Sequence, residues 1–367
     1  MLSDPFRVEA ALLRSSGPAQ KLLHARAAAA TVEHFGRQVF LRAVVEVSNY
    51  CRENCHYCGM RRDNRTLSRF RAHHDQLAEI LVHRRPPSIT DVNIQTGEDP
   101  VAVRETVLPL VKTLRAQTPL GISVCLGTLN ASLYGELKTA GASIYIMKFE
   151  MPEAGLYEAM EAPGTLEQRT EHIHLLASTG WKVSSGFIAG LPGQTDADLA
   201  ANFELARRLP LAGCSVSPFI PGEATPLASA PVGGIDLTLN CMAILRLMQP
   251  HWVIPAVSAL NLAGPGSGYG RGLRAGANLV TMNLTPSGMR EDYVLYKRDR
   301  FIMTEERILS AIAAEGLTAS RQSLADFYGL KKINGAARPS LSVRRHRNGD
   351  TQVKRDESGK AADLSPN

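Results

Sequence analysis

Three of the six cysteines lie close together in the segment CRENCHYC, where Cys51, Cys55 and Cys58 are separated by three and by two residues. Cysteines at such short spacing are typical of a metal or redox site. A structural zinc ion takes four protein ligands in a closed shell, and an electron-transfer cluster also takes four thiolates. His56 is adjacent to Cys55, and two neighbouring residues do not easily reach one small ion. The three thiolates favour a 4Fe–4S cluster with one iron open to a chelating ligand, and zinc is the alternative.

A buried strand is expected to position these cysteines. The run Phe40–Ser48 is rich in β-branched residues and ends just before Cys51. Upstream, the Ala/Leu-rich segment AQKLLHARAAAATVEHFG ends at Gly36, which predicts a helix with a C-terminal glycine. We therefore expect an N-terminal helical extension over residues 1–37 and a larger domain that begins at residue 38.

Short apolar runs then alternate with helical stretches. The expected strands are Phe40–Ser48, Thr90–Gln95, Gly121–Leu126, Ser143–Phe149, Trp181–Ala189, Gly213–Ser217, Val253–Val257 and Leu279–Asn283. The clearest helices are Val101–Ala116, Ser132–Ala140, Leu166–Thr179, Asp196–Arg208 and Leu237–Met248. This alternation indicates parallel βαβ units, and eight strands predict an α/β fold, a (βα)8 TIM-type barrel, over residues 38–330. A doubly wound open sheet has the same alternation and is the alternative.

Polar residues and glycines follow several of the expected strands. Gly97 and Glu98 come after the second strand, Lys148 and Glu150 end the fourth, and the segment GLPGQT follows the fifth. Active sites of TIM barrels lie at the C-terminal ends of the strands. We therefore expect these groups to meet the cysteines at one mouth of the barrel.

Charge and composition restrict the class of protein. The net charge is +6, and residues 331–367 alone hold nine Lys/Arg against four Asp/Glu. We predict that Lys331–Asn367 is a disordered basic tail, and we expect no nucleic-acid partner. The N-terminus carries Asp4 and Glu9 and does not read as a signal peptide, and no run reaches the ~18 apolar residues of a membrane span. Bunched cysteines indicate a reducing compartment, so a cytoplasmic protein without membrane contact is expected.

CRENCHYC resembles the CxxxCxxC signature of the radical S-adenosylmethionine (SAM) superfamily, including the aromatic Tyr57 before the last cysteine. The resemblance implies that Cys51, Cys55 and Cys58 ligate a 4Fe–4S cluster whose open iron is chelated by SAM. It implies that the reduced cluster cleaves SAM to methionine and a 5′-deoxyadenosyl radical, with a donor such as ferredoxin or flavodoxin supplying the electron. The barrel would position the cofactors and exclude water.

The surrounding segments resemble the biotin synthase-related branch, and most of all the FeFe-hydrogenase maturase family HydE. The similar segments are GRQVFLRAVVEVSNYCRENCHYCGMRRDNRTLSRFR, QTGEDP, SGFIAGLPGQT, PFIPGEATPLA, IPAVSAL and GANLVTMNLTP. The resemblance implies a radical reaction on a small-molecule substrate in assembly of the hydrogenase cofactor, with maturation proteins as partners. A mutase or lyase on an amino-acid-like substrate, similar to methylornithine synthase, is the alternative. A non-catalytic iron–sulfur or zinc protein is the alternative from another class.

The resemblance also assigns residues by position. By this resemblance, Glu150 and Arg169 match positions that hold SAM. Their chemistry suits that role, because Glu can accept hydrogen bonds from ribose hydroxyls and Arg can clamp a carboxylate. The alternative for this pair is a surface ion pair, and for the glycines of GLPGQT an ordinary turn. The residues implied to contact the cofactors are Tyr57, Gly97, Glu98, Glu150, Arg169, Gly190 and Gly193.

The chain departs from the pattern of its relatives in two places. No cysteine follows Cys241, which excludes the accessory C-terminal cluster of some maturases. Lys148-Phe149-Glu150 stands where the maturases tend to show Arg-His-Glu. This should alter the substrate cavity, because Arg and Lys bind anions differently. Lys148, Phe149 and Met151 are therefore expected to help define the substrate.

Sulfur insertion of the biotin synthase type is disfavoured. Cys125 in SVCLGTL resembles one ligand of the sulfur-donating cluster of that enzyme, but the other barrel positions read Asn93 and Ser184. One thiolate cannot hold a cluster that needs several. We therefore expect Cys125, Cys214 and Cys241 to be small buried residues of the core.

Overall fold

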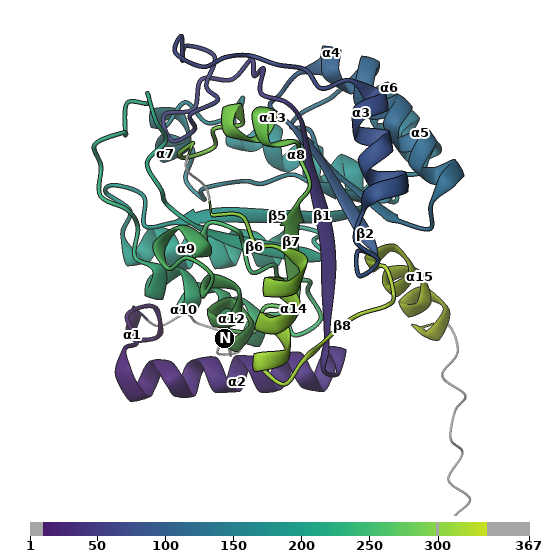
Figure 1. Cartoon of the computed structure of the whole chain (residues 1–367). Helices are drawn as coiled ribbons and strands as arrows, with labels where there is room; N and C mark the ends of the chain where they lie inside the picture. The colour runs from purple at the N-terminus through teal and green to yellow at the C-terminus, as the bar shows by residue number, and fades with distance from the viewer. Residues whose placement is uncertain (1–9, 299–300, 336–367) are drawn as a thin grey trace, which may run out of the picture.

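A curled sheet of parallel strands forms the centre of the computed structural model, which describes residues 10–298 and 301–335 (Figure 1). Its strands are β1 (Gln38–Ser48), β2 (Asp91–Thr96), β3 (Gly121–Cys125), β4 (Ile144–Ile146), β5 (Lys182–Ala189), β6 (Gly213–Pro218) and β7 (Leu279–Asn283), with the short β8 (Thr318–Ala319) paired to the start of β1. The spatial order is β6-β5-β4-β3-β2-β1-β7. Consecutive parallel strands joined by helices are the TIM-type arrangement, so the predicted fold class is confirmed.

Helices alternate with the strands and cover the outside of the sheet (Figure 1). They are α1 (Ala10–Leu13), α2 (Gly17–Phe35), α3 (His74–Glu79), α4 (Pro100–Ala102), α5 (Leu108–Gln117), α6 (Ala131–Ala140), α7 (Ala154–Ala159), α8 (Leu166–Ser178), α9 (Asp196–Arg208), α10 (Ile235–Met248), α11 (Leu260–Ala263), α12 (Gly268–Arg274), α13 (Ser287–Asp292), α14 (Glu305–Ala314) and α15 (Leu324–Gly335), with π-helical turns η1 (Ile80–Arg84) and η2 (Val103–Val107). The predicted N-terminal helix is α2, which ends at Gly36 with a φ of 66°. The domain boundaries stay a prediction.

The barrel closes between β6 and β7 through a segment that is not a full strand. Seven of the eight predicted runs form strands, whereas Val253–Val257 forms isolated bridges, from Val253 to Gly213 and from Pro255 to Leu279. Pro255 has no backbone N–H to donate, so a regular ladder cannot run through it. The two edges of the sheet are thus joined by single bridges.

Side chains of β1 alternate between the inside of the barrel and the helical layer. Leu41, Ala43 and Val45 are fully buried in the main apolar core, whereas Arg42 and Glu46 line an internal cavity. This follows from the two-residue period of a strand, which sends successive side chains to opposite faces. A charged residue inside the run FLRAVVEV therefore faces the interior of the barrel.

Helix α15 covers the end of the barrel where the strands begin. The backbone N–H of Leu324 donates to both carboxylate oxygens of Asp91, each at 3.0 Å, and Leu324 and Tyr328 line the internal cavity. The helix runs to Gly335. The prediction of disorder from Lys331 is therefore wrong for residues 331–335, which continue a helix whose first residue, Leu324, is held by Asp91. Residues 336–367 lie outside the described residues.

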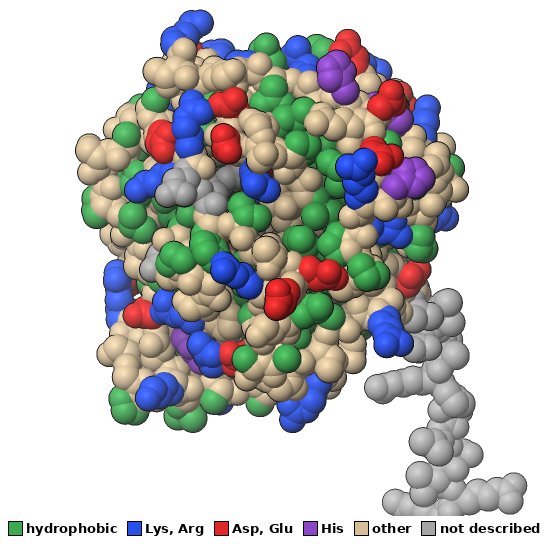
Figure 2. All heavy atoms as spheres, in the orientation of Figure 1, with side chains coloured by type: hydrophobic (Ala, Val, Ile, Leu, Met, Phe, Trp, Pro, Cys, Tyr) green, Lys and Arg blue, Asp and Glu red, His purple; other side chains and the backbone are tan. Residues whose placement is uncertain are grey.

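Two surface properties bear on possible partners. Within the described ranges, each helix is too short or too polar to cross a bilayer. On the face shown in Figure 2, the described Lys and Arg side chains are interspersed with Asp and Glu and form no continuous basic surface there. Residues 336–367, beyond the described residues, hold seven Lys/Arg against four Asp/Glu, and thus half of the net charge of +6.

Candidate active site

The cysteine loop follows β1 and is held in place by one arginine. Arg69 donates hydrogen bonds from Nη1 to the carbonyl oxygen of Met60 at 2.9 Å and from Nη2 to that of Arg61 at 2.6 Å. It also donates to the carbonyl oxygen of Asn49, directly before the loop. Because one guanidinium has five N–H donors, it can fix both ends of a loop at once.

Cys51, Cys55 and Cys58 are free thiols that line one cavity of ≈ 220 Å³, here called the upper cavity. The backbone N–H of Glu98 donates to the Sγ atom of Cys51 at 3.4 Å. Burial raises the pKa of the Cys58 thiol to about 12, and a bound metal displaces such a proton. The sequence thus brings its three predicted ligands together at one cavity.

The donor set fits a cluster better than a single ion. Within the described part of the chain, no three His, Cys, Asp or Glu side chains converge closely enough to hold one metal ion. The imidazole of His56 pairs instead with Glu161 at 3.2 Å, away from the thiols. In an iron–sulfur cluster each thiolate binds its own iron, so the thiolates need not converge on one point. The zinc alternative has no fourth ligand in this arrangement.

A buried ion pair forms the wall beside the cysteines. Arg169 donates from Nη2 to Oε1 of Glu98 at 2.9 Å, with the two side chains 4% and 8% exposed. Arg169 also donates to the hydroxyls of Thr128 at 3.1 Å and Tyr157 at 3.4 Å. The second oxygen of Glu98 accepts from Arg52 at 3.0 Å. Arg169 is thus paired with Glu98 in the interior, which contradicts the alternative of a surface ion pair between Arg169 and Glu150.

Glu150 lines the upper cavity with an unpaired carboxylate oxygen. Its Oε2 atom is buried and has no hydrogen-bond partner among the described residues. Burial raises the pKa of this carboxyl group, while the Lys148 and Arg169 charges lower it. The backbone of Glu150 has a φ of 62°, a left-handed conformation that costs a non-glycine residue about 1 kcal/mol or more. Backbone strain of this kind is concentrated at functional sites.

The predicted cofactor-contacting glycines fall into two groups. Gly97 lines the upper cavity, and a Cβ atom there would lie 2.2 Å from the carbonyl oxygen of Tyr50, so only glycine allows this close approach to the cysteine loop. Tyr57 and Glu98 line the same cavity. Gly190 and Gly193 adopt φ angles of 85° and 79° in the turn after β5 and do not line it. Their contact with the cofactor stays a prediction.

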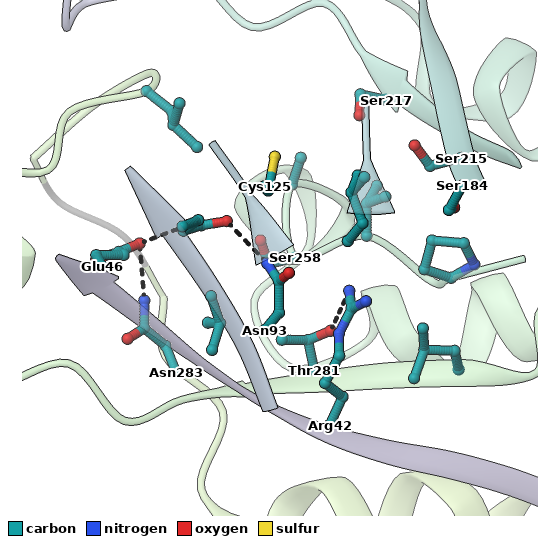
Figure 3. Close-up of a pocket in the computed structure, with 18 of the residues that line it drawn as sticks. Arg42, Glu46, Asn93, Cys125, Ser184, Ser215, Ser217, Ser258, Thr281 and Asn283 are labelled. Carbon is teal, nitrogen blue, oxygen red and sulfur yellow. Dashed lines mark hydrogen bonds between the residues drawn. The ribbon is translucent and has the colours of Figure 1, made fainter. Parts of the chain in front are cut away.

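A second cavity, of ≈ 190 Å³ and here called the lower cavity, continues into the barrel (Figure 3). The two cavities share the lining residues Gln95, Cys125, Ile146, Lys148, Ser217, Leu295 and Tyr296. The amino group of Lys148 donates to the hydroxyl of Ser217 at 3.3 Å at this junction. Inside the lower cavity, Glu46 accepts from Asn283 at 3.0 Å and from Gln95 at 3.4 Å.

The structure corrects the expectation for the segment around Lys148. Lys148 faces both cavities as predicted, but Phe149 and Met151 are fully buried in apolar clusters and line neither. The ring of Phe149 stacks on Phe187 with centroids 6.0 Å apart. Lys148 and Glu150 line the cavities while Phe149 packs into the outer apolar layer, so the alternation of a strand continues past the end of β4 at Ile146, where Glu150 forms an isolated bridge with Phe187.

The cysteines outside the loop behave in two ways. Cys214 and Cys241 are fully buried, as predicted. Cys125 is half-buried and lines the junction of the two cavities, so the expectation that it belongs to the core is wrong. Its position at the last residue of β3 places the thiol at the barrel interior.

Four candidate functional residues were not predicted from the sequence. They are Arg42 and Glu46, which line the lower cavity, Arg52, which donates a hydrogen bond to Glu98, and Arg69, which donates hydrogen bonds to the cysteine loop. Arg42 and Glu46 had a readable signal, because they are charged residues four apart in an otherwise apolar strand and must share one face. Arg52 and Arg69 had none, because arginines are common in polar loops and their partners lie far away in sequence.

Comparison with known proteins identifies relatives of the chain. Residues 45–206 match the model of the radical SAM superfamily. The [FeFe] hydrogenase maturase subunit HydE of Thermotoga maritima is 33% identical over 264 residues, which are 72% of this chain and 75% of that protein. A 3-methylornithine synthase of Methanosarcina barkeri is 26% identical over 302 residues, covering 80% and 83% of the two chains. A biotin synthase of Kocuria rhizophila is 27% identical over 245 residues, covering 65% and 52%.

A solved structure has the same fold. The crystal structure of methylornithine synthase (PylB) aligns with a TM-score of 0.77 at 23% identity. The alignment covers 87% of this chain and 94% of that one. The likeness therefore extends beyond the cysteine loop to nearly the whole barrel of that enzyme.

Proposed function

Because the chain belongs to the radical SAM superfamily, in its biotin synthase-related branch, we propose that it is an enzyme of the HydE type that serves assembly of the FeFe-hydrogenase cofactor. Enzymes of this superfamily use a 4Fe–4S cluster and SAM, act on small molecules and need a reductant. When bound, these groups would supply the one-electron chemistry by which SAM is cleaved to methionine and a 5′-deoxyadenosyl radical. The remaining roles belong to the residues of this chain.

The observation that carries the proposal is the convergence of three free thiols and the charged groups of one cavity. In the proposal Cys51, Cys55 and Cys58 hold the cluster. Glu150 accepts from SAM with its unpaired Oε2 atom, and Glu98 and Arg169 contribute further charges to the lining of the same cavity.

The lower cavity is the proposed substrate chamber. It adjoins the upper cavity through Lys148 and Cys125, so a molecule held there lies within reach of the chemistry at the cysteines. Lys148 carries a positive charge at this junction. Restoration of hydrogenase activity in a strain that lacks its own HydE tests the maturase role, and failure of a well-expressed chain to restore it contradicts that role.

A second candidate is a carbon-skeleton mutase on an amino-acid-like substrate. It is supported by the sequence likeness to 3-methylornithine synthase over 80% of the chain, and the absence of cysteines after Cys241 does not count against it. Formation of 3-methylornithine from a panel of amino acids, detected by mass spectrometry, would favour this candidate over the maturase.

We expect the anaerobically reconstituted protein, reduced with dithionite and incubated with SAM, to release 5′-deoxyadenosine and methionine in equal amounts. A Cys58→Ala variant carried through the same reconstitution is the control and should release neither. No release from a wild-type preparation with a full cluster would contradict the proposed enzyme and leave the non-catalytic iron–sulfur protein.

Glu150→Gln is expected to weaken SAM binding by about tenfold or more while leaving the iron content unchanged, because a charged acceptor contributes about 1.5–3 kcal/mol to a hydrogen bond. Equilibrium dialysis with labelled SAM and iron analysis provide the two readouts. Glu167→Gln makes the same chemical change at an exposed position of α8 and should bind SAM normally. Equal SAM affinity in both variants would refute the role of Glu150.

A further inference from the structure

Arg42 is an interior cation without a counter-ion. It lies on β1 and lines the lower cavity, and its side chain is half-buried at the cavity wall, with the Nε atom fully buried. Its Nε atom has no hydrogen-bond partner among the described residues, and its Nη2 atom makes only one long bond, to the hydroxyl of Thr281 at 3.4 Å. No ion pair joins Arg42 to a carboxylate in the described part of the chain. Buried charges in proteins are normally paired, so this guanidinium requires an explanation.

The nearest candidate counter-ion is already engaged. Asp91 stands opposite Arg42 in the β1–β2 register, but both of its oxygens accept from the backbone N–H of Leu324 at the start of α15. Thr90 donates a further hydrogen bond to Asp91 at 2.9 Å. Asp91 therefore fixes the floor of the barrel, and its charge acts on Arg42 only at longer range.

A comparison within the same chain shows what a structural arginine looks like here. Arg246 is fully buried in α10, and it donates to the carbonyl oxygens of Gly276, Pro250 and Trp252 and to Oδ1 of Asn278, at 2.8–3.0 Å. Arg246 thus has the network that a buried guanidinium needs. Arg42 lacks such a network, although its environment contains hydroxyl and amide groups that could have supplied one.

We propose that Arg42 is the anchor for the carboxylate of a small organic substrate at the bottom of the lower cavity. A planar guanidinium matches a carboxylate in a two-point, charge-assisted hydrogen bond. Figure 3 shows Arg42 beside Thr281, with its guanidinium directed into the cavity that Cys125 and Ser217 enter from the other end. The inference rests on the proposed function, in that the lower cavity is taken as the substrate chamber.

The surroundings favour a carboxylate over a phosphate. Val253, Pro255 and Leu279 line the same part of the barrel and offer no charge. The other cation of the chamber, Lys148, lies at the junction with the upper cavity, bonded to Ser217. A phosphate group with nearly two negative charges would need more than one cation at the same point, whereas a carboxylate is neutralised by one.

The position of Arg42 also orients the substrate. Arg42 precedes Ser48, the last residue of β1, by six residues, which is about 20 Å along a strand. The carboxylate would therefore lie at the end of the chamber remote from the cysteines. The opposite end of the molecule would face Lys148 and Cys125, where the two cavities meet. The reacting atom is thus at the end of the substrate that does not carry the carboxylate.

The test measures thermal stability and calorimetric binding of the reconstituted full-length protein with straight-chain carboxylates from propionate to hexanoate. Alkylammonium ions of equal length and inorganic phosphate are the comparison probes. We expect at least one carboxylate to stabilise the wild type and the matched ammonium ion and phosphate to have no effect. Arg42→Met should lower the affinity for that carboxylate by about tenfold or more. Arg42→Lys, which keeps the charge without the fork, should retain part of it.

Stability of the ligand-free protein separates a binding role from a structural one. Arg42→Met should unfold at the same or a higher temperature than the wild type, because it removes a charge that has no carboxylate partner in the interior of the barrel. Arg246→Met, the matched control, should unfold at a clearly lower temperature. Failure of Arg42→Met to fold, equal carboxylate binding in wild type and Arg42→Met, or no carboxylate binding by the wild type would each overturn the proposal.

The test of the carboxylate anchor and the test of the proposed enzyme activity can fail separately. Carboxylate binding that depends on Arg42 in a protein that releases no 5′-deoxyadenosine would refute the enzyme and leave the anchor in place. Release of 5′-deoxyadenosine with no Arg42-dependent binding would refute the anchor and leave the enzyme in place.

Discussion

Cys55→Ala is expected to abolish the visible absorbance of the reconstituted cluster and with it all release of 5′-deoxyadenosine. Cys55 is 6% exposed and lines the upper cavity. The described lining of this cavity holds the three thiols of the cysteine loop and, at its lower end, the thiol of Cys125. With two thiolates left in the loop, the cluster would lose a ligand that no other described side chain can replace, because His56 is engaged with Glu161. Ultraviolet–visible spectra and iron and sulfide analysis after anaerobic reconstitution measure the effect.

Cys241→Ala is the matched control for this experiment. Cys241 is fully buried in α10, far from the loop in sequence and absent from both cavities. The substitution removes one sulfur atom from the core and should lower stability slightly, while the absorbance stays that of the wild type. Equal loss of absorbance in the two variants would show that the ligands are misassigned.

Arg169→Met is expected to lower the free energy of unfolding by about 3 kcal/mol, because removing one partner of a buried pair leaves the other charge uncompensated. Glu98, Thr128 and Tyr157 all lose a hydrogen bond to this guanidinium. SAM affinity should fall by tenfold or more, because the charged wall of the upper cavity is lost. Chemical denaturation and equilibrium dialysis give the two values.

Arg52→Met is the control for Arg169→Met, because Arg52 donates to the other oxygen of the same carboxylate. The side chain of Arg52 is 50% exposed, against 4% for Arg169. An exposed ion pair contributes about 1 kcal/mol or less. A destabilisation by Arg52→Met as large as that by Arg169→Met would contradict the assignment of the buried pair as the main support of this wall.

The sequence was sufficient for the arrangement of the strands, because β-branched runs, helical periods and turn residues are local signals. It failed at Val253–Val257, where a strand-like apolar run contains Pro255 and forms only bridges. It also failed at Lys331, because the end of α15 depends on how its first turn is capped by Asp91, a residue more than two hundred positions away.

The site was predictable where chemistry is encoded in spacing, as in Cys51, Cys55 and Cys58. The partner of Arg169 was not, because Glu98 and Glu150 both end strands that lead to the same mouth, and only the fold decides which carboxylate meets the guanidinium. The position of Phe149 was not predictable either, because it lies beyond β4. Only the bridge between Glu150 and Phe187 shows that the alternation of a strand continues there and sends Phe149 to the outer layer.

Arg69 has a consequence for the order in which the enzyme is built. Its hydrogen bonds to the carbonyl groups of Asn49, Met60 and Arg61 fix the cysteine loop through contacts that need neither iron nor sulfide. Ordering a residue costs about 1–2 kcal/mol of conformational entropy. That entropy is lost when the chain folds, so the later uptake of iron and sulfide proceeds on a loop that is already ordered.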